Sequence, residues 1–77
     1  MENEIVIFIN RKEYKAANRR MTGLQILELA DFGADHDLFL LQGEGDRTGG
    51  APIGLEQEVE LKDGEHFRAI PGNRNFG

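Results

Sequence analysis

The first apolar run of the chain, residues 5–9 (IVIFI), is rich in β-branched side chains and predicts a strand. Residues 10–13 (NRKE) predict a turn. Residues 13–18 alternate only weakly between apolar and polar side chains. They predict a second, poorly hydrophobic strand at the edge of a sheet, which would form a hairpin with the first.

The hydrophobic period then changes from that of a strand to that of a helix. Residues 22–25 (TGLQ) match a capping box, in which the threonine hydroxyl accepts from the amide three residues on and glutamine reaches back. Leu24, Leu27 and Ala30 recur every three residues and so share one stripe of a short helix. Gly33 is placed for a left-handed C-terminal cap.

Residues 37–42 (DLFLLQ) are too few and too aromatic for a second helix and predict a strand. Residues 43–54 contain five of the ten glycines and one of the two prolines, which predicts a long loop. Val59 and Leu61 alternate with charged residues, as in a strand, and residues 62–65 (KDGE) predict a turn.

Residues 66–70 (HFRAI) predict the last strand, which should end near Ile70 because Pro71 cannot donate to a ladder. In so short a chain, this order favours an α+β domain of the β-grasp type, with a mixed sheet of four to five strands packed on one helix. The predicted core is Ile5, Ile7, Ile9, Leu24, Leu27, Ala30, Phe39, Leu41, Leu61 and Phe67.

Composition narrows the classes of function. The 77 residues make one small domain, and the absence of cysteine excludes disulfides, zinc–thiolate sites and thiol catalysis. No stretch resembles a signal peptide or approaches a membrane span, so we expect a soluble, cytoplasmic protein with no membrane partner. A net charge of −5, from 14 acidic and nine basic side chains, argues against nucleic-acid binding and favours partners with basic grooves.

The stretches that could form a catalytic or metal site lack the residues that such sites need. The glycine-rich stretch GEGDRTGG lacks the lysine and helix start of a phosphate-binding loop, and its carboxylates would repel phosphate. His36 and His66 have no partners at metal-ligand spacing, and the chain has no serine nucleophile. We therefore expect no metal, no cofactor and no enzymatic activity.

Three stretches together resemble a known family: TGLQILELA, DLFLL with its glycine-rich loop, and VELKDGEHFRAIPG. They are similar to the bacterial multiubiquitin domains, ubiquitin-like modules encoded beside activating-enzyme, conjugating-enzyme and JAB-type peptidase genes. The resemblance spans roughly residues 5–71. It implies a β-grasp fold and a protein modifier, with E1-type, E2-type and JAB-type enzymes as partners. Operons of this kind are associated with defence against phage, which no residue here indicates.

The resemblance divides the chain into a ubiquitin-like domain, residues 1–70, and a flexible conjugation tail, residues 71–77. It implies that Gly77 is the conjugation residue, whose carboxylate is adenylated with ATP and passed through enzyme cysteines to an unknown target protein. A terminal glycine suits both steps because no Cβ crowds its carbonyl. The predicted recognition residues of the tail are Gly72, Asn73, Arg74, Asn75 and Phe76.

Period-two alternation also predicts a partner-binding patch on the exposed face of the sheet. If Ile5, Ile7 and Ile9 point inward, Phe8 points outward, and the same logic places Leu40 and Ile70 beside it with Arg68 at the margin.

Two other functions stay open. One is a β-grasp sulfur carrier that forms a C-terminal thiocarboxylate, and the other is a non-covalent binding module with an inert tail. The acceptor, amine or hydroxyl, also stays open, as does whether Gly77 is encoded last or exposed by processing.

Overall fold

The computed structural model describes residues 4–43, 45–46 and 49–72. Its elements, in chain order, are β1 (Ile5–Ile9), β2 (Lys12–Ala16), β3 (Arg20–Thr22), α1 (Gly23–Leu29), β4 (His36–Leu40), β5 (Ala51–Ile53), β6 (Glu58–Glu60) and β7 (Glu65–Pro71).

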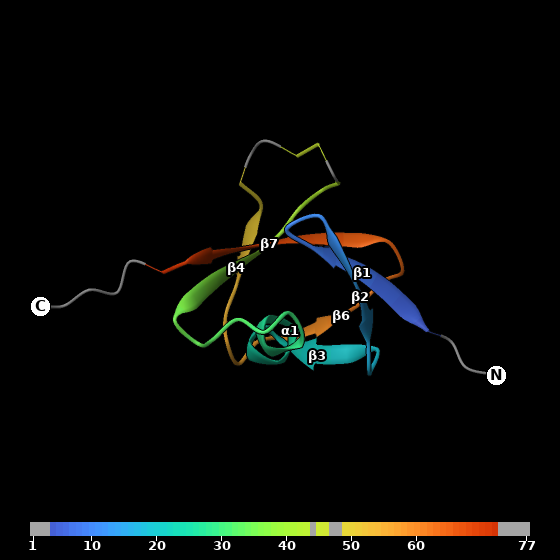
Figure 1. The fold of residues 1–77 in the computed structure, drawn as a ribbon, viewed down its shortest axis with the longest axis horizontal. Helices are drawn as coiled ribbons and strands as arrows, with labels where there is room; N and C mark the ends of the chain where they lie inside the picture. The colour runs from blue at the N-terminus through green and yellow to red at the C-terminus, as the bar shows by residue number, and fades with distance from the viewer. Residues whose placement is uncertain (1–3, 44, 47–48, 73–77) are drawn as a thin grey trace, which may run out of the picture.

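The main sheet has five strands in the order β2-β1-β7-β4-β5, and a small sheet pairs β3 with β6. β1 and β7 are parallel, and the other pairs of the main sheet are antiparallel. Helix α1 lies across one face of this sheet (Figure 1). The structure therefore confirms an α+β, ubiquitin-like β-grasp fold with a mixed sheet packed on one helix.

The β1–β2 hairpin turns on only two residues, Asn10 and Arg11, with φ angles of 56° and 70°. Positive φ at both positions is typical of a type I′ turn, whose twist matches that of the strands it joins. β2 consequently begins at Lys12, inside the predicted turn, and it ends at Ala16 rather than residue 18.

Helix α1 begins with the predicted capping box. The Gln25 amide donates to Thr22 Oγ1 at 3.2 Å, and the Thr22 amide donates to Gln25 Oε1 at 2.9 Å. The buried face of the helix, however, differs from the predicted one. Ile26 is buried beside Leu27, whereas Leu24 is only partly buried.

The predicted C-terminal cap at Gly33 is wrong, because Asp31 holds the left-handed position with φ 67°. The Asp31 amide donates to the Glu28 carbonyl at 2.9 Å, and the Phe32 amide donates to the Leu27 carbonyl at 2.8 Å. This pair of bonds is a Schellman motif, and aspartate is one of the few residues besides glycine that tolerate its geometry.

Two short strands were not predicted. β5 lies within residues 43–54, which were expected to be loop throughout, and pairs with β4. β3 pairs with β6 across 38 residues of sequence, Met21 lying opposite Val59. A strand of three residues is too short to show a hydrophobic period in the sequence. Its existence depends on the segment with which it pairs.

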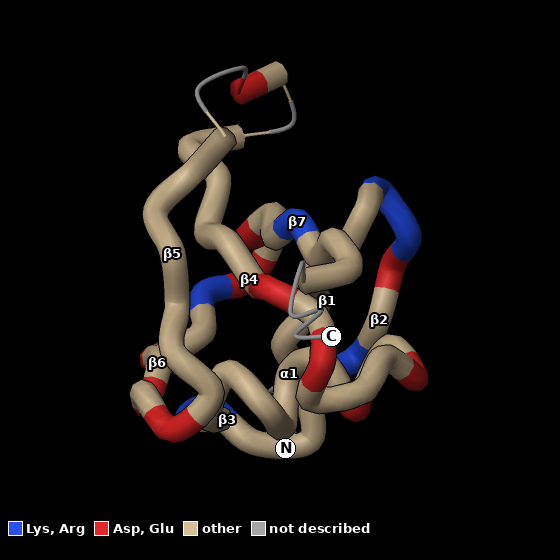
Figure 2. Tube along the Cα trace, turned by 90° about the vertical axis from the view of Figure 1, so that its left-hand side faces the viewer, with Lys and Arg blue, Asp and Glu red and all other residues tan. Residues whose placement is uncertain are grey.

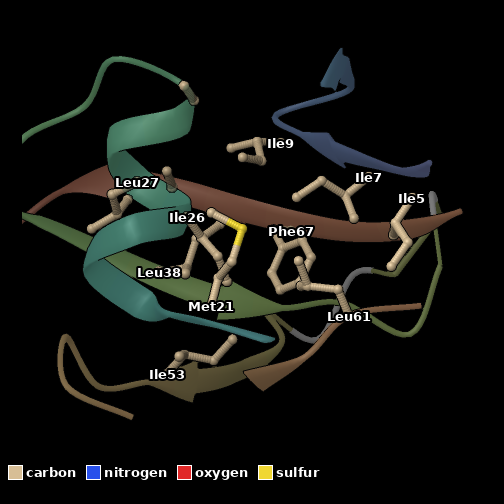
Figure 3. Packing of buried hydrophobic residues seen from close by; sticks show 12 residues of the cluster. Ile5, Ile7, Ile9, Met21, Ile26, Leu27, Leu38, Ile53, Leu61 and Phe67 are labelled. Atoms are coloured by element: carbon tan, nitrogen blue, oxygen red, sulfur yellow. The ribbon is translucent and has the colours of Figure 1, made fainter. Parts of the chain in front are cut away.

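One hydrophobic cluster fills the space between α1 and the main sheet (Figure 3). The predictions Leu24, Phe39 and Leu41 are wrong, since all three are only partly buried. The buried set is Ile5, Ile7, Ile9, Met21, Ile26, Leu27, Ala30, Leu38, Ile53, Leu61, Phe67 and Ala69. None of the helices in the described part of the chain is long and apolar enough to span a membrane.

Candidate functional site

The C-terminal end of β7 is the point where the folded sheet leads into the predicted tail. The β4–β7 ladder continues past Ile70, since Pro71 lies opposite His36, and the Gly72 amide donates to the Asp35 carbonyl at 2.7 Å. Pairing therefore extends beyond the expected end of the strand. The predicted site residues Asn73, Arg74, Asn75, Phe76 and Gly77 lie outside the described residues.

On its other side, β7 extends beyond the end of β1, its parallel neighbour. β1 pairs with β7 only as far as Ile9 opposite Phe67. The side chain of Asn10 replaces the missing strand: its Nδ2 donates to the Ala69 carbonyl at 3.0 Å, and its Oδ1 accepts from the Ala69 amide at 2.9 Å. The Asn10 amide also donates to the Phe67 carbonyl at 3.0 Å. We call this arrangement the Asn10 clamp.

The α1–β4 loop supports the same end of β7. His36 Nδ1 lies 2.9 Å from Asp35 Oδ1, and the His36 ring packs 4.7 Å from the Phe32 ring, centroid to centroid. The imidazole is therefore mostly buried at the strand end, with 20% of its side chain exposed. Within the described ranges, no three histidine or carboxylate side chains cluster as metal ligands would.

The sheet face opposite α1 carries the predicted patch. Ile5, Ile7 and Ile9 do point inward, so Phe8 lies outward. Its ring stacks on His66, with the centroids 4.6 Å apart and the planes 11° from parallel. Arg68 and Ile70 follow at alternate positions of β7, so the face runs about 13 Å along this strand towards the tail.

The prediction that Leu40 faces outward is wrong. Leu40 packs against the buried cluster, and Phe39, directly opposite Arg68, takes its place on the outer face. Leu38, which is 2% exposed, fixes this alternation. The stretch LFLL is apolar at both parities, so the sequence alone cannot show which set is buried. From here the outer patch means Phe8, Phe39, Arg68 and Ile70.

A hollow of about 320 Å³ adjoins the outer patch where the β1–β2 turn meets β7, and Asn10, Arg11, His66 and Arg68 are among its lining residues. Arg11 in this turn and Lys12 at the start of β2 form a basic stretch, blue in Figure 2. The clamp thus fixes the position of a basic turn beside the outer patch.

Sequence reasoning missed three residues of this site: Asn10, Phe39 and His66. Asparagine followed by a short turn is a signal for positive φ. Nothing local indicates that the Asn10 side chain reaches Ala69, 59 residues away.

A family model described as multiubiquitin matches residues 5–72, which include every described strand and the helix. No curated protein and no solved structure matches the chain.

Proposed function

The chain belongs to the multiubiquitin family, and on that premise we propose that it is a ubiquitin-like modifier attached to other proteins through Gly77. The proposed partners are an E1-type activating enzyme, an E2-type conjugating enzyme and a JAB-type peptidase. In this proposal the chain is the substrate of those enzymes and supplies no catalytic group.

The proposed reaction activates the carboxylate of Gly77 and then transfers the acyl group three times. A carboxylate oxygen of Gly77 attacks the α-phosphate of ATP and displaces pyrophosphate. A thiolate of the activating enzyme attacks the resulting carbonyl and releases AMP, leaving a thioester. After exchange onto a cysteine of the conjugating enzyme, an amine or hydroxyl of the target attacks the carbonyl and releases that thiol.

The observation that carries the proposal is the position of Gly72, the last residue that the structure describes. The Gly72 amide is held to Asp35, and five residues separate it from the Gly77 carboxylate. Fully extended, five residues reach about 17 Å. That length supports delivery of the carboxylate into another protein while the sheet stays outside.

The outer patch supports the same proposal, because it lies on the strand that leads into the tail. An enzyme that bound Phe39 and Ile70 could hold the domain close to the site where the carboxylate reacts. The two phenylalanines and the isoleucine form an apolar surface with Arg68 among them, a composition common in protein–protein contacts.

The test is thioester formation with ATP and an E1-type activating enzyme from the same genome. The intact chain should give a covalent adduct that a thiol reductant removes, and a chain lacking Gly77 should give none. A chain lacking Asn75 is the matched control, because it is equally short but keeps the terminal glycine, and it should still react. An adduct that forms equally well without Gly77 would contradict the proposal.

The same mixture, with sulfide added as the sulfur donor that displaces AMP from the adenylate, separates the two other functions. A sulfur carrier would release a free chain heavier by about 16 Da, the mass difference between sulfur and oxygen. A non-covalent module would give neither product, and its affinity for a partner would be unchanged by removal of residues 73–77.

A further inference from the structure

The main sheet has a free edge at β2. β2 pairs with β1 along one side, and in the described part of the chain no strand pairs with its other side. Glu13 and Lys15 are exposed there. The opposite edge, β5, is shorter, and its central residue Pro52 has no amide to donate. Of the two edges, β2 is therefore the better template for an added strand.

The hairpin register shows which backbone groups of β2 face this edge. Antiparallel pairs alternate between hydrogen-bonded and non-bonded positions. The Val6 amide donates to Asp63 Oδ1 at 2.8 Å, and the Val6 carbonyl accepts from the Gly64 amide at 2.7 Å. Both groups of Val6 thus point away from β2.

Lys15 lies opposite Val6, so this pair is non-bonded, and Glu13, two residues away, has the same parity. The amide and carbonyl groups of Glu13 and Lys15 consequently point outward from the free edge. An added strand can form its ladder with these two residues without disturbing the hairpin.

We propose that a second copy of this chain occupies the edge, with the two β2 strands antiparallel and Glu13 of each opposite Lys15 of the other. This register pairs outward-facing residues, as a ladder requires, and sets opposite charges against each other twice. The neighbouring registers of the same parity place Glu13 against Glu13 or Lys15 against Lys15. Charge complementarity therefore selects one register, which forms a symmetric dimer.

The symmetry axis of this dimer passes beside Tyr14, which then lies opposite Tyr14 of the second copy on the helix-side face. Tyr14 is half-buried and sits at a non-bonded position with respect to the new ladder, where side chains approach most closely.

The existing ion pair of Lys15 with Glu4, 3.7 Å apart, does not prevent this pairing. Both side chains are exposed, so breaking the ion pair costs little. β1 lies between the pairing edge and β7, so the added strand does not touch the strand that leads into the tail.

The net charge of −5 on each copy opposes association, so the dimer should be weak and favoured by salt that screens the overall repulsion. The experiment is sedimentation equilibrium of the full chain from micromolar to millimolar concentration. Amide hydrogen exchange is measured in parallel, and Glu13 and Lys15 should gain protection as the concentration rises.

Charge exchange tests the register itself. Glu13→Lys and Lys15→Glu should each weaken self-association about tenfold, because two attractive pairs become repulsive. Mixing these two variants should restore association, since each then opposes the other with complementary charges, and the double variant should dimerise as the unmodified chain does. All these substitutions are on exposed side chains, so the fold is retained.

Three results would overturn the proposal. One is a chain that stays monomeric over the whole range, as it would if the edge instead accepted an extended peptide from another protein. Another is a dimer that both single variants leave unchanged. The last is the absence of a mixed dimer between Glu13→Lys and Lys15→Glu.

Discussion

Replacing Asn10 with glycine should release the end of β7 while leaving the turn intact. Glycine adopts the φ of 56° at this position without strain, so the substitution removes only the side chain. What is lost is the side-chain part of the Asn10 clamp, two hydrogen bonds of 3.0 and 2.9 Å to the carbonyl and amide of Ala69, whereas the backbone bond to Phe67 remains.

The expected cost follows from those two bonds. Each is worth about 0.5–1.5 kcal/mol net, which gives about 1–3 kcal/mol for Asn10→Gly. For a domain of this size, a loss of about 1 kcal/mol lowers the Tm by roughly 4–8 °C. The cost should reach the upper part of this range if water cannot replace the lost partners, because Ala69 is only 5% exposed.

Arg11→Gly is the matched control in the same turn. Arg11 has a φ of 70°, which costs an L-residue about 1–2 kcal/mol, so glycine should stabilise the domain by about 0.5–1 kcal/mol. Urea unfolding of both variants measures the two free energies, and hydrogen exchange at the Ala69 amide locates the effect. An Asn10→Gly variant as stable as the unmodified chain, with unchanged protection at Ala69, would refute the role given to the clamp.

Two further substitutions test the packing. Gly23→Ala should destabilise the domain by about 1–3 kcal/mol in thermal unfolding, because its Cβ would collide with the carbonyl oxygen of Gly54; an unchanged Tm would contradict this contact. Leu38→Ala should cost about 2–5 kcal/mol in urea unfolding, whereas Leu41→Ala should cost much less, because only Leu38 is in the core. Equal costs would contradict the assigned face of β4.

The elements predicted well are those with short-range causes. The capping box lies within four residues, and its spacing alone placed the N-cap of α1 at Thr22. β1 was predicted as a strand, with its three isoleucines in the core, from a run of adjacent β-branched residues. In both cases adjacent residues place the element, although IVIFI is apolar at both parities and its pattern alone does not show which face is buried.

The predictions were wrong or incomplete where contacts between residues distant in the sequence determine the structure. β4 offers apolar side chains at both parities, so its buried face depends on the register with β7. β3 and β5 have three residues each and exist because a distant segment pairs with them. The clamp likewise joins Asn10 to Ala69. None of these contacts produces a hydrophobic period that could be recognised in the sequence.

β7, the strand that leads into the predicted tail, is hydrogen-bonded along both of its edges. β7 pairs with β1 and β4, and where β1 ends the Asn10 clamp takes over its bonding role. The two clamp bonds at Ala69 and the bond from Gly72 to Asp35 all resist peeling of β7 from its end. An enzyme that draws the tail into its active site would therefore meet resistance at Gly72, because further extension requires these bonds to break. In the proposed function, the clamp and the Asp35 contact would therefore fix Gly72 as the point from which the tail extends.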